Sequence, residues 1–137
     1  RNRKYRGAEL STGCITAWPL VASDTVKLID VVWFNKGTST VAAAFEVEHS
    51  TSIYSGIMRM LDLILSPSAI SSAPIFIVAP NARRDEVLTQ WRRPAFAQLS
   101  QVEVRYLPYQ HLVDHQEAII RFGSGLKPIL NVSERLA

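Results

Sequence analysis

The chain has 137 residues, of which 47% are hydrophobic and 20% are charged, as is typical of one soluble globular domain. This composition excludes a disordered or low-complexity chain, and no apolar run approaches the roughly 20 residues needed to span a bilayer. The single cysteine, Cys14, excludes an internal disulfide and a cysteine-rich zinc site. Because no signal-peptide pattern is visible either, we expect a reducing, cytoplasmic setting away from membranes. Since the sequence starts with Arg1 rather than Met, we expect residues 1–137 to be a single domain taken from a longer chain.

Positive charge is concentrated in short segments. The formal net charge is +3, but residues 1–7 hold four basic residues and no acid, so the rest of the chain is close to neutral. Phosphate affinity must therefore come from local clusters. We expect residues 1–13 to be a basic, loosely ordered start. An Arg-Arg pair at the start of a predicted helix is a second cluster, although a solvated helix start explains that pair equally well. The candidate nucleic-acid-binding residues are Arg3, Lys4, Arg6, Arg83 and Arg84.

The first predicted elements are two strands. Residues 14–22 are apolar, but Pro19 argues against a central strand there. Residues 26–34 are β-branched and aromatic on both faces, which predicts a strand that is covered on both sides. Turn residues at 35–40 separate it from a second strand at 41–48. The two strands are expected to form an antiparallel hairpin.

After the hairpin, the apolar spacing changes from that of a strand to that of a helix. The pattern predicts an amphipathic helix that is capped by Ser50 or Thr51 and ended by Ser66-Pro67. Its apolar face carries Ile53, Ile57, Met60, Leu61, Ile64 and Leu65.

The remaining elements alternate between strand and helix. Residues 75–79 predict a buried strand, and residues 82–99 predict a helix with a break near Arg93, ahead of Pro94. Residues 102–107 alternate polar and apolar, as an edge strand does, and a last helix over 110–122 is stopped by Gly123 and Gly125. The order β-β-α-β-α-β-α predicts an α/β sandwich with a mixed central sheet flanked by helices.

Three carboxylates mark the candidate site. Asp30 lies within the apolar strand, where a buried charge is costly unless it is paired or bound to a metal. Glu46 and Glu48 share one face of the next strand because side chains alternate. A turn centred near residue 38 gives opposed residues an index sum of 76, which places Asp30 across from Glu46. Oxygen-only ligands favour Mg²⁺ or Mn²⁺. The alternative is that the glutamates pair with Arg59 or Arg84 on a solvated sheet face.

This pattern resembles a known nuclease superfamily. Ile29-Asp30, a turn and then Glu46-Val47-Glu48 is similar to the motif of the PD-(D/E)XK nucleases, which share the restriction-endonuclease-like α/β fold. The resemblance covers residues 26–79 and, more loosely, the chain up to residue 109. Two positions depart from the family pattern: Ile29 replaces a proline, and Glu48 replaces the lysine that steadies charge on the phosphorane. The second departure leaves the catalytic role of position 48 open between a metal ligand and a base.

The resemblance implies a site and an activity. The implied metal ligands are the side chains of Asp30, Glu46 and Glu48 and the carbonyl of Val47. Asp30, Glu46 and Glu48 are the implied catalytic residues, and we add Arg59, which belongs to a polar helix stripe with Ser52, Ser55 and Asp62. The alternative for Arg59 is a solvated helix face on which it pairs with Asp62.

The predicted function is a metal-dependent endonuclease that hydrolyses DNA phosphodiester bonds with Mg²⁺ or Mn²⁺. The alternative is a catalytically lapsed nuclease-fold module for nucleic-acid binding or assembly. The expected partners are DNA and either a second copy of the chain or an additional domain. His111 and His115 have a spacing that fits zinc, but the sequence offers no third ligand near them.

Overall fold

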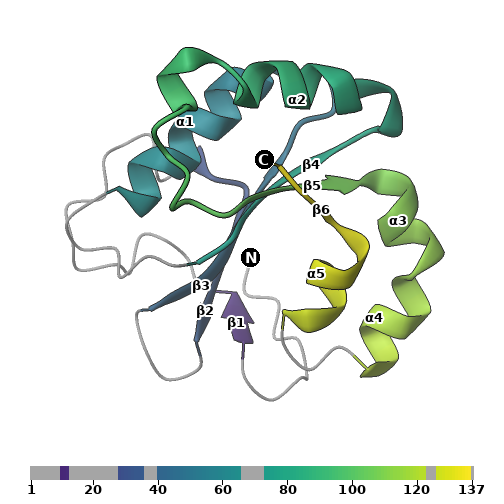
Figure 1. Ribbon diagram of the computed structural model, residues 1–137. Coiled ribbons are helices and arrows are strands. Elements are labelled where there is room, and N and C mark those ends of the chain that lie inside the picture. The colour runs from purple at the N-terminus through teal and green to yellow at the C-terminus, as the bar shows by residue number, and fades with distance from the viewer. Residues whose placement is uncertain (1–9, 13–27, 36–39, 66–72, 123–125, 137) are drawn as a thin grey trace.

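A computed structural model describes residues 10–12, 28–35, 40–65, 73–122 and 126–136 (Figure 1). The basic residues Arg3, Lys4 and Arg6 and the apolar segment 14–22 lie outside the described residues, so the expectations for them stay predictions.

The described residues form a mixed sheet of six strands, which neighbour one another in their chain order. The first three are antiparallel, β3, β4 and β5 are parallel, and β6 returns antiparallel to β5. The strands are β1 (Leu10–Thr12), β2 (Val31–Asn35), β3 (Val41–Val47), β4 (Ile75–Ala79), β5 (Val104–Pro108) and β6 (Glu134–Arg135).

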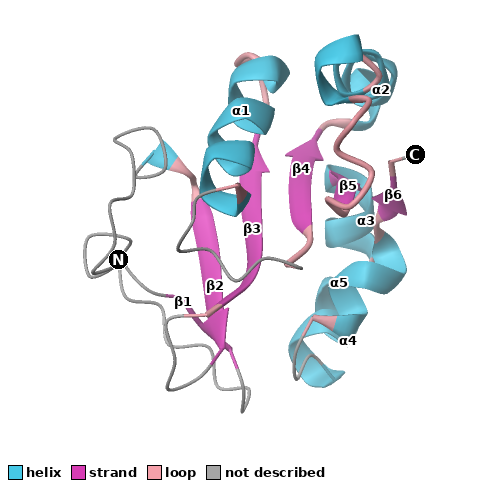
Figure 2. Ribbon diagram, turned by 60° about the vertical axis from the view of Figure 1, so that its left-hand side comes forward, coloured by secondary structure: helices cyan, strands magenta, loops and turns pink. Residues whose placement is uncertain are grey.

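Helices cover both faces of this sheet. On one face lie α1 (Ile53–Ile64) and α2 (Arg84–Trp91), which connect successive parallel strands (Figures 1 and 2). On the other face lie α3 (Tyr109–Asp114), α4 (Gln116–Phe122) and α5 (Lys127–Val132). Short 3₁₀ turns at Asn81–Arg83 and Pro94–Phe96 flank α2. The predicted α/β sandwich with a mixed central sheet flanked by helices is thus confirmed.

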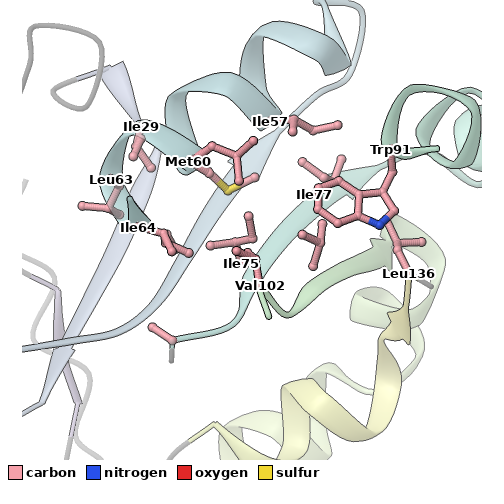
Figure 3. Packing of buried hydrophobic residues seen from close by; sticks show 14 of the residues in the cluster. Ile29, Ile57, Met60, Leu63, Ile64, Ile75, Ile77, Trp91, Val102 and Leu136 are labelled. Carbon is pink, nitrogen blue, oxygen red and sulfur yellow. The ribbon is translucent and has the colours of Figure 1, made fainter. Parts of the chain in front are cut away.

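The larger of two hydrophobic cores lies between the sheet and the α1–α2 layer. Figure 3 shows Ile57 and Met60 of α1 directed toward Ile75 and Ile77 of β4, and these four residues are fully buried. Burial of one such side chain contributes about 1.5–3 kcal/mol. A second core on the opposite face includes Phe45, Phe76, Val78, Leu107 and Ile129. Because β3 and β4 are covered on both faces, most of their residues are apolar.

The predicted hairpin has the expected register. Val31 pairs with Phe45 and Val32 with Ala44, so that each pair of residue numbers sums to 76. The register shifts between Trp33 and Phe34. The predicted span of the first strand, 26–34, is wrong at its described start, because residues 28–30 precede β2 and belong to no strand.

Other boundaries are partly confirmed. The strand at 75–79 is confirmed, and so is the break near Arg93 in the helix predicted over 82–99. The helix cap is Ser52, whose hydroxyl accepts a hydrogen bond from the Ser55 amide at 3.3 Å, rather than Ser50 or Thr51. The helix over 110–122 is divided at His115. The prediction that 102–107 is an edge strand is wrong, because β6 pairs with β5 on its outer side.

Candidate functional site

The candidate site forms where β2 begins and β3 ends, since these antiparallel strands bring the two positions together. Asp30 immediately precedes β2, and its Oδ2 accepts a hydrogen bond from the Val47 amide at 2.8 Å. Asp30 is exposed, so the prediction of a buried carboxylate inside an apolar strand is wrong. The chain bends at residue 30 before the ladder starts, and the carboxylate is therefore at the sheet margin.

Glu46 and Glu48 lie on the sheet face that α1 covers. Both side chains are essentially inaccessible to solvent, whereas Val47 between them is 45% exposed. The predicted common face of the two carboxylates is thus confirmed, and it follows from the alternation of side chains along β3. The alternative of a solvated sheet face is wrong, because helix α1 covers this part of the sheet.

Arg59 neutralises part of this buried negative charge. From α1, its Nε and Nη2 donate to the two carboxylate oxygens of Glu46, each at 2.8 Å. Its Nη2 also donates to Oε1 of Glu48 at 3.1 Å. The forked guanidinium matches a carboxylate with two parallel hydrogen bonds, which a lysine cannot do. Arg59 therefore connects the two acids. The pairing of the glutamates with Arg59, which was the alternative to a metal site, is present, but it lies at a buried position.

Glu48 is further fixed by its immediate surroundings. The Thr51 hydroxyl donates a hydrogen bond to Oε2 of Glu48. A Cβ added to Gly56 would lie 2.4 Å from Oε1 of Glu48 and 3.4 Å from Cβ of Glu46. The close approach of α1 to β3 therefore depends on glycine at position 56.

The electrostatic balance of the site is negative. Burial raises the pKa of Glu46 from 4.5 to about 7, and the nearby charges of Asp30 and Glu48 add to this effect. Arg59 opposes the rise through its hydrogen bonds and its charge. In return, the hydrogen bonds to Glu46 raise the pKa of Arg59. Arg59 is hydrogen-bonded to two of the three carboxylates, and an additional cation would be stabilised there.

A cavity of about 370 Å³ opens beside these groups. Its lining includes Asp30, Val47, Glu48 and Arg59, together with the hydroxyl side chains of Thr51, Ser52 and Ser55. Carboxylate and hydroxyl oxygens are donors of the kind that Mg²⁺ and Mn²⁺ prefer, so the chemistry of the donor set fits a hard divalent cation.

The same residues are not arranged around a common metal position. Within the described part of the chain, no group of three or more His, Cys, Asp or Glu residues is placed to hold a metal ion. Glu46 is engaged by Arg59, and Asp30 by the Val47 amide. The cation that the glutamates share is the guanidinium of Arg59.

Two predicted DNA-binding arginines, Arg83 at the end of the 3₁₀ turn and Arg84 at the start of α2, have partners within the protein. Arg83 donates to the carbonyls of Glu48 and Thr51 at 2.9 and 2.8 Å, and it also pairs with Glu86. Arg84 forms two hydrogen bonds with Glu134 of β6, at 2.9 and 2.5 Å. Their contact with DNA stays a prediction, but their observed role is to join elements of the fold.

Other polar features lie away from the carboxylates. His111 and His115 are exposed, and each ring contacts a backbone carbonyl, of Val132 and His111 respectively. A second cavity, of about 540 Å³, is lined by residues near the ends of α2 and β6 that include Arg92 and Arg135. No acidic side chain is among its described lining residues, so it does not offer a metal site of the same kind.

The sequence alone did not identify Thr51, Gly56 and Arg83 as parts of this site. The string from Glu48 to Gly56 contains a signal for Gly56, since an interior helix glycine is unfavourable unless something packs closely against it. The role of Arg83 depends on contacts with residues more than 30 positions away, which spacing does not reveal.

Comparison with known proteins identifies the family. Residues 14–123 match the family described as the C-terminal domain of the type II restriction enzyme NmeDI. The chain therefore belongs to this family of restriction-enzyme domains. The type II restriction enzyme NmeDI of Neisseria meningitidis serogroup C is 37% identical to the chain over 95 residues. The match covers 68% of the chain and 25% of NmeDI, so the chain corresponds to about a quarter of this relative's length.

A search for similar solved structures and a search for membrane-spanning helices are both negative. No solved structure gives a significant match to the chain. Among the helices that the structure describes, none has the length and apolarity needed to cross a membrane.

Proposed function

We propose that the chain is the DNA-cleaving domain of a type II restriction enzyme and hydrolyses phosphodiester bonds with Mg²⁺ or Mn²⁺. The observation that carries this proposal is the buried pair Glu46 and Glu48, with Glu48 and Asp30 lining a cavity, in a chain of a restriction-enzyme family. Buried carboxylates in an apolar sheet cost stability, and such residues are typical of functional sites. The resemblance to the PD-(D/E)XK motif supports the same assignment.

The residues that would hold the metal are the carboxylates of Asp30, Glu46 and Glu48 and the carbonyl of Val47. A bound Mg²⁺ ion supplies Lewis acidity toward a phosphate oxygen and lowers the pKa of a bound water. The proximity of Asp30 and Glu48 to Glu46 supports this choice, since burial raises the pKa of Glu46 and the two neighbouring negative charges add to that rise. Arg59 is the cation of the site that can contact a phosphate, since it lines the cavity.

A second candidate function is a nuclease-fold module that binds DNA or assembles with other domains without cleaving. The observation that favours it is the ion pairing of Arg59 with both glutamates, which occupies oxygens that a metal needs. Glutamate in place of the motif lysine also favours a module that does not cleave.

If the chain does cleave, one site cuts one strand. A double-strand break then requires a second copy of the chain or another catalytic domain.

The two functions are distinguished by plasmid cleavage. The chain, alone and within its natural full-length protein, is incubated with plasmid and Mg²⁺, Mn²⁺ or EDTA. We expect cleavage that EDTA abolishes and that Glu46→Gln reduces by about 100-fold or more. The matched control is Glu117→Gln, which removes an exposed acid from α4 on the opposite face of the sheet. DNA binding by the chain without cleavage in any metal, or full-length cleavage that Glu46→Gln leaves unchanged, would instead support the non-cleaving module.

Metal binding has an independent measure in thermal stability. A ligand that binds only the native state raises the melting temperature. We expect Mg²⁺ or Mn²⁺ to raise the melting temperature of the wild type and of Glu117→Gln, but not of Glu46→Gln. An equal rise in all three proteins would place the metal away from Glu46.

A further inference from the structure

We propose that Arg59 is an exchangeable counter-ion: it neutralises Glu46 and Glu48 in the free protein, and DNA phosphate draws it away so that a divalent metal takes its place. Metal and DNA then bind cooperatively, each raising the affinity for the other. This inference rests on the proposed metal-dependent nuclease function, and it concerns how that same site is assembled.

The first argument is competition for the same oxygens. Arg59 engages both oxygens of Glu46 and one oxygen of Glu48, at 2.8, 2.8 and 3.1 Å. The second oxygen of Glu48 accepts a hydrogen bond from Thr51. A divalent ion on the two glutamates would therefore need oxygens that the guanidinium now occupies. Two cations a few ångströms apart in a buried site also repel each other strongly.

The second argument is that the carboxylates cannot be left without a cation. Glu46 and Glu48 are 0% and 1% exposed, and an unpaired charge at such a position is strongly destabilising. In the free protein Arg59 supplies the missing charge. If Arg59 leaves, the two glutamates need another positive charge, which a metal ion supplies, so release of Arg59 favours entry of the metal.

The third argument is that the side chain of Arg59 has access to the cavity. Its side chain is 23% exposed, and it lines the cavity together with Ser52 and Ser55 of the same helix. The guanidinium can therefore turn from the carboxylates toward a phosphate in the cavity without unfolding α1. Arginine binds phosphate with the same two-pronged geometry that it uses for carboxylate. Among the described residues that line this cavity, Arg59 is the one with a positive charge.

The coupling has a measurable consequence. When two ligands stabilise the same rearrangement, each raises the affinity of the other by an equal factor, typically about 5- to 150-fold. We expect Mn²⁺ to bind the free chain weakly and to bind at least about fivefold more tightly when DNA is present.

The test is Mn²⁺ binding followed by the electron paramagnetic resonance signal of the free ion. Titrations are carried out with no DNA, with a mixed-sequence phosphorothioate duplex, and with a methylphosphonate duplex whose backbone is neutral. The variants are Arg59→Gln, which removes the charge, and Arg59→Lys, which keeps the charge but loses the fork. Arg92→Gln is the matched control, because it removes one exposed arginine that does not line the site cavity.

We expect Arg59→Gln without DNA to bind Mn²⁺ at least about tenfold more tightly than the wild type, and DNA to add little further affinity. Arg59→Lys should lie between the two, and Arg92→Gln should behave as the wild type. The methylphosphonate duplex should not raise Mn²⁺ affinity in any variant. Circular dichroism melting checks that each variant is folded.

Several results would overturn the proposal. One is unchanged or weaker Mn²⁺ binding in Arg59→Gln; another is a DNA effect of wild-type size in that variant. Should Arg59→Gln not fold, wild-type metal affinity and wild-type coupling in Arg59→Lys would overturn it. Absence of Mn²⁺ binding in every protein, with or without DNA, would overturn this inference together with the proposed metal dependence. Cooperative Mn²⁺ binding without any cleavage would sustain this inference while the proposed cleavage fails.

Discussion

At the scale of single residues, the site is a compromise between burial and charge. Glu46 in β3 and Glu48 directly after it occupy inward positions that packing alone would assign to apolar side chains. Arg59 forms hydrogen bonds to both carboxylates, but burial still raises the pKa of Glu46 to about 7. Replacement of a buried ion pair by apolar residues is often neutral or stabilising, so fold stability does not explain why these acids are present. Their presence is better explained by a functional requirement for negative charge.

Gly56 provides the first test at this scale. Gly56→Ala should lower the free energy of unfolding by about 1–3 kcal/mol, although alanine favours a helix more than glycine does. The reason is the 2.4 Å separation between the new Cβ and Oε1 of Glu48, an oxygen that Arg59 also contacts. Denaturant unfolding measures the loss. In a Glu48→Ala background the same substitution should be neutral or stabilising, because the clashing atom is gone.

A loss of equal size in the Glu48→Ala background would contradict this account. It would show that the helix at position 56 is limited by something other than Glu48. The double-mutant cycle is suited to this question because the two side chains would be in direct contact.

The residues of the site could be predicted better than their environments. Glu46, Glu48 and Arg59 follow from strand and helix periodicity, and the structure confirms that they come together. The prediction that Asp30 is buried was wrong, because apolar neighbours in the sequence do not reveal where a strand starts. Residues 28–30 have the composition of a strand, but the ladder with β3 begins only at Val31.

At the scale of elements, Arg83 fixes the connection that leads from β3 to α1. Its guanidinium donates to the carbonyls of Glu48 and Thr51, and it also pairs with Glu86 in the first turn of α2. These bonds satisfy two carbonyls of an irregular segment that lies next to the site. The orientation of Glu48 and Thr51 toward Arg59 therefore depends on α2 as well as on α1.

Arg83→Ala tests this connection. We expect a loss of about 1–2 kcal/mol in the free energy of unfolding, because two carbonyls lose their donor at a partly exposed position. Hydrogen exchange of the amides at 49–52 should accelerate more than that of β4. Glu86→Gln is the control, since it weakens the ion pair and leaves both carbonyl bonds in place. Equal effects of the two substitutions would show that the ion pair, and not the carbonyl contacts, matters.

Short elements were the least predictable part of the fold. The strands β1 and β6 have three and two residues, and α5 has six, so none shows a periodic pattern. They exist because of their partners: β1 pairs with β2, and β6 pairs with β5. Longer elements such as α1 and β4 were predictable because their own apolar patterns determine which faces are buried.

At the scale of the whole molecule, the C-terminal segment closes one edge of the sheet. Arg105 of β5 donates to the carbonyls of Leu130 and Ser133, and thereby holds the end of α5 against the sheet. The chain then pairs as β6, where the Leu136 amide donates to the Val104 carbonyl at 2.8 Å. The predicted edge strand is covered because these contacts join it to residues about 30 positions later. Arg84 completes the closure by linking α2 to Glu134.

This closure should depend on pH in a defined direction. Hydrogen bonds from Arg84 lower the pKa of Glu134 below its ordinary value of 4.5. A carboxyl group whose pKa is lowered in the folded state stabilises the protein at pH values above its pKa in the unfolded state. This contribution is lost as the pH falls through the lowered pKa of the folded state. We therefore expect Arg84→Gln to lower the melting temperature by a few degrees at pH 7 and to have little effect at a pH well below 4.5.

In a Glu134→Gln background, Arg84→Gln should cause a smaller loss at pH 7, since the partner charge is already absent. A loss that is the same at both pH values, or the same in both backgrounds, would mean that Arg84 stabilises the closed edge through contacts other than Glu134.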